Sequence, residues 1–254
     1  QGVQAKEFIL PKELLEQDCV ISLSKMKTHA LERITGAVKN SYGFIYGFHK
    51  AKGHTQYPSA DSFARMLIDL NKCVAPKLYV MDGIVAMEGN GPGSGDPVPM
   101  NVLLMSTDPV ALDSVFSRLV YLKPEMVPTN YHGEKMGLGT WKEEEITLLT
   151  PDGEISMAEA VKKYGNPAFK VDRTEVRKNI WTRMAGALNI FQKKPYIEAD
   201  KCVRCGICVQ SCPVPGKAVD FRKGKGKPPV YDYRKCIRCF CCQEMCPKKA
   251  IKVK

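Results

Sequence analysis

The sequence predicts an α/β domain over residues 1–192, with a mostly parallel sheet and flanking helices, followed by a small cysteine-rich domain over residues 193–254. Two observations lead to this division. Short apolar runs alternate with amphipathic stretches through the first 192 residues, which is the pattern of strands and helices in an α/β sheet. Nine of the 11 cysteines then fall within the last 53 residues, and eight of these form two copies of one spacing. A chain of 254 residues is expected to form one large and one small domain.

Apolar runs in the larger domain predict three buried strands, at residues 19–27 (CVISLSKMK), 77–85 (KLYVMDGIV) and 101–106 (NVLLMS). Residues 61–74 carry an apolar stripe at helical spacing. Residues 108–121 predict a second helix, with Asp108 as its cap and a proline in its first turn. Residues 146–155 predict an edge strand and a turn.

The segment between the two domains, Val176 to Gln192, is basic and amphipathic. Its apolar side chains are expected to pack this segment against another part of the protein as it bridges the domains. These side chains are Ile180, Trp181, Met184, Leu188 and Phe191. The domain boundary is therefore predicted near Lys193.

The cysteine-rich domain contains the spacing C-x2-C-x2-C-x3-C-P twice. The two runs are Cys202, Cys205, Cys208 and Cys212 before Pro213, and Cys236, Cys239, Cys242 and Cys246 before Pro247. Three thiolates on one loop suit three irons of a cubane iron–sulfur cluster, and in two-cluster ferredoxins the fourth cysteine of each run binds the other cluster. The predicted ligand sets are Cys202, Cys205, Cys208 and Cys246 for one [4Fe–4S] cluster, and Cys236, Cys239, Cys242 and Cys212 for the other.

Two other uses of eight cysteines fit the pattern less well. A zinc site uses pairs of cysteines or histidines separated by a longer loop. A disulfide framework needs partners with suitable geometry, and cysteines two or three residues apart in a loop pair poorly. The chain opens Gln-Gly-Val without a methionine or a charged and apolar leader, so it is expected to be a processed or truncated form of something longer.

The last 62 residues resemble a bacterial-type two-cluster ferredoxin. This resemblance implies a small α+β domain in which each half contributes a strand, a cluster loop and a short helix. One departure is the connection from Val214 to Lys235, whose stretch FRKGKGKPPVYDYRK predicts an exposed hairpin or loop.

Three cysteines lie outside the ligand sets. Cys241 stands beside Cys242 in the sequence CFCC and is expected to be a packed thiol near a cluster. Cys19 and Cys73 lie in apolar surroundings and are expected to be buried. Free thiols and air-sensitive clusters predict a reducing compartment, the cytoplasm.

The formal positive charge of the chain lies entirely on the cysteine-rich domain. Residues 193–254 hold 16 Lys and Arg against 5 Asp and Glu, whereas residues 1–192 hold 22 of each. Two oxidised clusters with their thiolates would reduce the net charge of +11 to about +7. The basic surface can steer an acidic redox protein or raise the reduction potentials. Nucleic-acid binding is not expected, because no motif accompanies the scattered bases. Nor does any run of 18 apolar residues predict a membrane span.

Polar residues follow the predicted strands of the larger domain, where open α/β sheets place their ligands. Lys25, Lys27 and His29 alternate, so they point to one side of an extended segment, and Lys39 and Asn40 follow a short helical piece. Such residues suit a small anionic substrate or acid–base chemistry. The alternative is that the lysines are solvated residues at a strand end.

Two further polar sets follow the second and third strands. The second set consists of Asp82, Glu88, Gly89, Asn90, Gly91, Gly93 and Gly95, and the third of Asp108 and Asp113. Alternating glycines let the backbone approach a ligand closely, although the loop matches neither a dinucleotide fingerprint nor a P-loop. A tight surface loop is the alternative, and capping alone would explain Asp108.

These sets, in this order and ahead of the cysteine runs, resemble the DUF362 family of iron–sulfur proteins. The resemblance rests on SKMKTHALERITGAVKNSYG (24–43), DGIVAMEGNGPGSGDP (82–97) and DPVALDSV (108–115). The family carries a domain of unknown function and is common in anaerobic bacteria and archaea. Its members usually have further strand–helix units upstream, so this chain is expected to lack that part or to receive it from another chain.

Electron transfer is the leading functional hypothesis, with two clusters relaying electrons to or from a partner or ligand at the α/β domain. The alternative is a ferredoxin-dependent oxidoreductase that binds a small anionic substrate, a flavin or a divalent metal. In that case Lys25, Lys27, His29 and Lys39 would hold anionic groups, and Asp82, Glu88 or Asp113 would transfer protons or bind the metal. A third hypothesis is a maturation factor that supplies electrons to a client enzyme.

Overall fold

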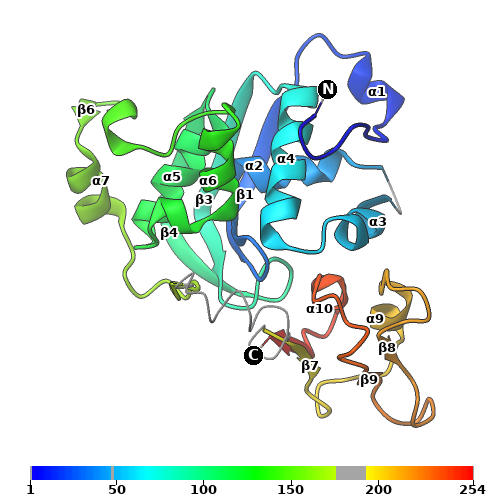
Figure 1. Ribbon diagram of the computed structural model, residues 1–254. Coiled ribbons are helices and arrows are strands. Elements are labelled where there is room, and N and C mark those ends of the chain that lie inside the picture. Colours follow the sequence, from blue (N-terminus) through cyan, green and yellow to red (C-terminus); the bar gives the residue numbers. More distant parts are fainter. Residues whose placement is uncertain (1, 47–48, 176–192, 254) are drawn as a thin grey trace. The chain divides into compact units, whose positions relative to one another are not determined.

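The computed structural model describes residues 2–46, 49–175 and 193–253 (Figure 1). The chain divides into two compact units, 1–172 and 173–254. The predicted bridging segment, 176–192, lies outside the described residues. The boundary near Lys193 therefore stays a prediction.

The first unit is built on a four-stranded sheet in the order β2-β1-β3-β4. Its strands are β1 (Ile21–His29), β2 (Arg33–Thr35), β3 (Leu78–Glu88) and β4 (Asp96–Ser106). Only β1 and β3 pair in parallel among the described strands, so a mostly parallel sheet is not confirmed. The reason is local, because short loops join β1 to β2 and β3 to β4, and such loops connect antiparallel neighbours.

The remaining elements of the first unit are mostly helical. They are α1 (Lys12–Leu15), α2 (Ala37–Asn40), η1 (Ser41–Phe44), α3 (His49–Gln56), α4 (Ala60–Val74), α5 (Pro109–Leu119), η2 (Pro124–Met126), α6 (Pro128–Lys135), η3 (Glu143–Glu145), the hairpin strands β5 (Leu148–Thr150) and β6 (Gly153–Ile155), and α7 (Met157–Tyr164). The predicted helices at 61–74 and 108–121 are confirmed as α4 and α5. Ser59 caps α4 through a capping box, and the Asp108 side chain accepts hydrogen bonds from the first turn of α5.

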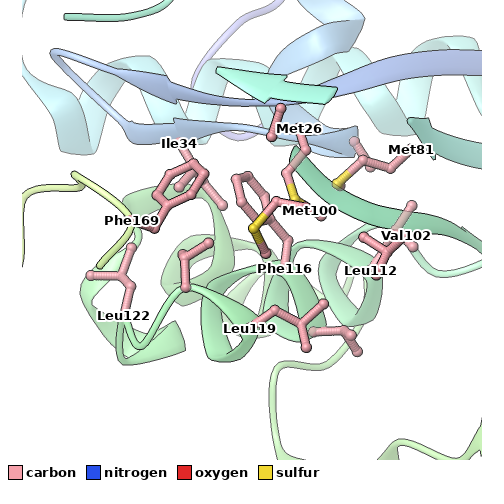
Figure 2. Packing of buried hydrophobic residues seen from close by; sticks show 14 of the residues in the cluster. Met26, Ile34, Met81, Met100, Val102, Leu112, Phe116, Leu119, Leu122 and Phe169 are labelled. Carbon is pink, nitrogen blue, oxygen red and sulfur yellow. The ribbon is translucent and has the colours of Figure 1, made fainter. Parts of the chain in front are cut away.

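One face of the sheet packs against helices. Figure 2 shows apolar side chains of the strands, among them Met26, Met81 and Met100, meeting Phe116 and Leu119 of α5. Met26, Met81 and Phe116 are completely buried. A second core lies between α4 and the segments around it. The helices therefore cover one face of the sheet continuously.

The prediction of fully buried strands is wrong for the opposite face of the sheet. Leu23 of β1 is 71% exposed, and Leu103 and Met105 of β4 are 54% and 61% exposed. In β1 the side chains alternate, so that Ser22 and Ser24 are buried while their apolar neighbours face outward. The alternation is typical of a sheet with helices on one side only.

The second unit is a small α+β domain. Strand β7 (Pro195–Ile197) pairs antiparallel with β10 (Ile251–Val253), and β8 (Val219–Asp220) pairs with β9 (Val230–Tyr231). Short helices α9 (Ile207–Gln210) and α10 (Cys241–Glu244) follow the two cysteine loops. The segment between β8 and β9 is mostly exposed, as the Gly/Lys/Pro composition predicts. Across the described residues of both units, no helix is long and apolar enough to cross a membrane.

Candidate functional site

Eight cysteines of the second unit line two separate cavities. Cys202, Cys205, Cys208 and Cys246 line one, and Cys212, Cys236, Cys239 and Cys242 line the other. Each cavity thus receives three cysteines from one run and the fourth from the other run. The structure brings together the same two sets of four that the spacing predicts.

Matching backbone turns shape the two cysteine loops. Arg204 and Gly206 in the first run, and Arg238 and Phe240 in the second, all have positive φ, between 57° and 78°. These residues occupy equivalent places in the two runs, two and four positions after the first cysteine. A left-handed backbone conformation is unfavourable for arginine and phenylalanine. Its presence at equivalent positions of both cysteine loops indicates that the path of the loop requires this conformation. The two cysteine loops therefore share the same backbone turn.

Burial disfavours the charged form of these thiols when no cation is present. Desolvation raises the pKa of Cys208 to about 11 and raises that of Cys236. A hydrogen bond with Cys241 lowers the pKa of Cys239 and raises that of Cys241, so Cys241 is the protonated donor of this pair. Iron would supply the positive charge that buried thiolates need.

Hydrogen-bond donors surround the cysteine sulfurs. The Tyr231 hydroxyl donates to Cys242 Sγ at 3.1 Å, and the backbone N–H groups of Ala218 and Ala250 lie 3.3 Å from Cys212 Sγ and Cys246 Sγ. Donors of this kind stabilise metal-bound thiolates and tune the attached group. Four cysteines around each cavity, with such donors beside them, are the ligand types and number that a [4Fe–4S] cluster uses.

The other cysteines divide into one packed and two exposed thiols. Cys241 is buried within the second loop, beside the ligand candidates. Cys19 and Cys73 are exposed, so their predicted burial is wrong. Cys19 lies in the loop before β1, and Cys73 lies in the last turn of α4, away from the apolar stripe of that helix.

The lysines of β1 lie on the open side of the sheet. Lys25 Nζ contacts Asp82 Oδ2 at 2.6 Å and donates to the Val85 carbonyl at 3.1 Å. The hydrogen bond from Lys25 to the Asp82 carboxylate is the main cause of the lowered pKa of Asp82. Lys27 follows on the same strand, half-buried. Two predicted site residues, Lys25 and Asp82, therefore meet, and they neutralise each other.

His29 and Asn40 hold local structure. The buried His29 ring accepts hydrogen bonds at Nδ1 from the backbone N–H groups of Leu31 and Glu32, both at 3.1 Å. Asn40 Nδ2 donates to the Leu23 carbonyl at 3.0 Å. β2 pairs with β1 only at residues 27–29, so Asn40 supplies a hydrogen bond to a part of β1 that β2 does not reach. Each contact provides a structural reason for a residue that the pattern placed in a site.

Lys39 lies beside a buried carboxyl group that the sequence analysis did not single out. Glu32 is completely buried, and neither carboxyl oxygen has a hydrogen-bond partner among the residues that the structure describes. Desolvation raises the pKa of Glu32 well above its ordinary value, opposed by the charge of Lys39. The only sequence signal is one acidic residue within ALERITGAV, which does not by itself predict burial.

Glu88 and its glycine loop are engaged in packing. Glu88 accepts a hydrogen bond from the Lys170 backbone at 2.9 Å and pairs with the Lys170 ammonium at 3.2 Å. A Cβ on Gly91 would lie 2.1 Å from the Thr28 carbonyl oxygen, and one on Gly95 would lie 2.2 Å from that of Glu88. Glycine is thus required at Gly91 and Gly95 for close backbone packing. Asn90 and Gly93 belong to the same loop.

Asp113 joins two helices. Its carboxylate accepts hydrogen bonds from the backbone N–H groups of Ala37 at 2.5 Å and Val38 at 3.1 Å. Complete burial raises the pKa of Asp113 to about 7. Asp108 caps α5, as the sequence predicts, and also accepts from the Thr140 N–H at 2.9 Å. Helix capping accounts for both aspartates.

Comparison with known proteins supports the two-part organisation. Residues 1–118 match the family described as "Domain of unknown function (DUF362)", and residues 194–247 match the "4Fe-4S dicluster domain". Over 130 residues the chain is 42% identical to the "Thylakoid-associated protein sll1697" of Synechocystis sp. (strain ATCC 27184 / PCC 6803 / Kazusa), a match that spans 51% of this chain and 40% of the relative. No solved structure matches the chain. The chain therefore contains a DUF362 domain at residues 1–118 and a 4Fe–4S dicluster domain at residues 194–247.

Proposed function

We propose that this protein carries two [4Fe–4S] clusters, one in each cysteine cavity, and that electrons pass through them between a redox partner and a partner or ligand of the α/β domain. The supporting observation is that eight cysteines line two cavities in sets of four. Each set combines three cysteines of one sequence run with the fourth cysteine of the other run. This exchange of the fourth ligand is the arrangement of two-cluster ferredoxins.

The chain's own residues have distinct tasks in this proposal. When bound, each cluster supplies one-electron chemistry. The eight cysteines hold the clusters, while Tyr231 and the backbone amides of Ala218 and Ala250 stabilise sulfur charge. Apolar core residues pack around the buried Cys208, Cys212 and Cys242 and limit the access of water to those sulfurs.

An acidic redox protein is the partner that the charge distribution favours. Residues 193–254 carry a net formal charge of +11 before the clusters are counted. Lys223, Lys225 and Lys227 lie on the exposed connection between β8 and β9. Such a surface attracts acidic partners by long-range electrostatics. A client enzyme with an acidic face would satisfy the same requirement, as the maturation hypothesis supposes.

The oxidoreductase hypothesis receives less support from the α/β domain. Glu88 and Asp113, which would transfer protons or bind a metal, are engaged in backbone hydrogen bonds. Lys25 is paired with Asp82, which reduces the charge it can offer to an anionic substrate or a flavin phosphate. We therefore favour the electron-transfer role.

Paired cysteine variants test the proposed ligand sets. The protein is purified without oxygen, its iron and sulfide are quantified, and the reduced form is studied by EPR spectroscopy. Cys202→Ser and Cys246→Ser are expected to perturb the same cluster signal, because both residues line one cavity. Cys212→Ser is expected to perturb the other signal, together with Cys236→Ser. Cys241→Ser serves as the matched control and should retain both signals.

The pairing of variants makes the test decisive. If Cys246→Ser perturbed the same signal as Cys236→Ser, each run would hold its own cluster and the exchange would be wrong. Zinc in place of iron and sulfide would refute the redox role itself.

A further inference from the structure

A cavity separate from the cysteine sites is lined by residues of the N-terminal segment and of helices α3 and α4 in the α/β domain. Figure 1 labels both helices. Its volume is about 710 Å³, within the range of small-molecule sites. The described residues that line it are Gln4, Lys6, Glu7, Phe8, Ile9, Tyr42, Ile45, His49, Gly53, Thr55, Gln56, Tyr57 and Met66.

The wall formed by the N-terminal segment is firmly held. The buried Asp69 of α4 accepts hydrogen bonds from three successive backbone N–H groups, at residues 3–5, with distances of 2.6–2.9 Å. Arg65 of the same helix donates to the Gln4 side chain at 2.9 Å, and the Tyr46 N–H donates to the Ile9 carbonyl at 3.1 Å. The segment is therefore attached at both ends of the wall, as a preformed site requires.

An aromatic side chain fixes the opposite wall. Tyr42 packs edge-on against Phe63 and His54, with ring centroids 4.9 Å and 5.5 Å apart. Its hydroxyl donates to the Lys50 carbonyl at 2.6 Å. With Phe8 of the N-terminal segment and Met66 of α4 also lining the cavity, its walls together offer polarisable apolar surface, which suits a flat ring.

A tyrosine brings a hydrogen-bonding group to the cavity. Tyr57 is 8% exposed and lines the cavity, yet no described residue forms a hydrogen bond with its hydroxyl. Burial, reinforced by the charge of Asp69, raises the pKa of Tyr57 above its ordinary value of 10.0. The hydroxyl therefore remains protonated at neutral pH and can donate to an acceptor.

The charges at the cavity cancel. Lys6 and Glu7 are the charged residues among the described lining, apart from the titratable His49. The described lining therefore holds one lysine and one glutamate, with neither sign of charge in excess. We propose that this cavity binds a planar, uncharged ring compound whose carbonyl oxygen accepts a hydrogen bond from Tyr57.

A pair of probe molecules tests this assignment on the cluster-loaded full chain. 2-Quinolone is a flat, uncharged bicyclic ring with a carbonyl group, and naphthalene has the same size without that group. Calorimetry under anaerobic conditions should show saturable binding of 2-quinolone. Its affinity should exceed that of naphthalene about 2- to 12-fold, the contribution of one net hydrogen bond.

Three variants distinguish the cavity from other surfaces. Tyr57→Phe should lower the affinity for 2-quinolone about 2- to 12-fold and leave that for naphthalene unchanged. Tyr164→Phe, which changes a tyrosine outside the cavity, should change neither affinity. Gln56→Trp places a bulky ring at an exposed lining position and should abolish binding of both probes.

Different binding results would refute the site itself and the recognition of a carbonyl group. Absence of saturable binding to the wild-type protein would overturn the site. Equal affinities for the two probes, both unchanged in Tyr57→Phe, would overturn carbonyl recognition. Circular dichroism verifies that each variant is folded, and the comparison of probes on wild-type protein does not depend on any variant. Because the assay reads binding alone, its outcome is independent of the proposed electron transfer.

Discussion

Tyr231→Phe should lower the reduction potential of one cluster only. In the structure the Tyr231 hydroxyl donates to Cys242 Sγ at 3.1 Å. Burial raises the pKa of Tyr231, so the hydroxyl remains a donor throughout the accessible pH range. Reduction adds negative charge to the iron–sulfur unit and its thiolates, which strengthens this hydrogen bond. Its removal therefore destabilises the reduced state more than the oxidised state.

The size of the shift follows from the energy of one hydrogen bond. A hydrogen bond to a charged group contributes about 1.5–3 kcal/mol. The added electron is shared among all irons and sulfurs, so we assign about a third of that energy, roughly 0.5–1 kcal/mol, to the difference between oxidation states. For one electron, about 1.4 kcal/mol corresponds to about 59 mV, and the expected decrease is about 20–40 mV.

Tyr233→Phe is the matched control. Its ring stacks on Tyr231 with centroids 5.6 Å apart, but its hydroxyl donates to the Pro195 carbonyl at 2.9 Å instead of to a sulfur. An anaerobic redox titration followed by EPR would measure both cluster potentials in both variants. A higher potential in Tyr231→Phe, or an equal decrease in Tyr233→Phe, would refute the reasoning.

Three further predictions concern the stability of the α/β domain. Because its pKa is raised, Asp113 binds more protons in the native state than in the unfolded state between about pH 4 and 7. Its contribution to stability therefore falls as the pH rises through this range, by up to about 4 kcal/mol. Asp113→Asn should remove this pH dependence from the free energy of unfolding, measured with denaturant at several pH values. Gly36→Ala would place a Cβ 1.9 Å from Asp113 Oδ1 and should lower the free energy of unfolding by about 1–3 kcal/mol in the same assay; an unchanged value would contradict the close packing. Met26→Ala should lower the free energy of unfolding by about 2–5 kcal/mol and Leu23→Ala by less than about 0.5 kcal/mol, because Met26 is buried and Leu23 is exposed. Equal losses in the two variants would indicate that the outer face of the sheet is covered in solution.

Local patterns predict the elements of this fold better than their arrangement. The helix at 108–121 could be predicted because an aspartate followed by a proline is a local start signal, and Asp108 caps α5 as expected. The direction of β4 could not be read from its apolar run. It depends on the seven-residue loop from Gly89 to Gly95, which returns the chain beside β3. Exposure of Leu23 likewise depends on which sheet face receives helices.

The same distinction applies to the candidate sites. The cysteine spacing carries its chemistry locally, because three ligands of each predicted set lie within seven residues. The polar residues after β1 carry no such local constraint. Lys25 and Lys39 stand 14 positions apart, and their partners, Asp82 and the Tyr42 ring, are set by tertiary packing. The cavity at Tyr57 has no sequence signature, since its walls come from three separate segments.

The two proposed sites would select their ligands by different physical means. The cysteine-rich domain retains a net charge of about +7 with both clusters oxidised, so a charged macromolecule is attracted before any contact forms. The described lining of the cavity at Tyr57 contains one lysine and one glutamate and offers aromatic surface with polar side chains, so shape and short-range contacts would discriminate there. Attraction to the first site is screened by salt, whereas apolar burial in the second is not weakened by it. Added salt is therefore expected to weaken the binding of an acidic partner without weakening that of a small uncharged ring.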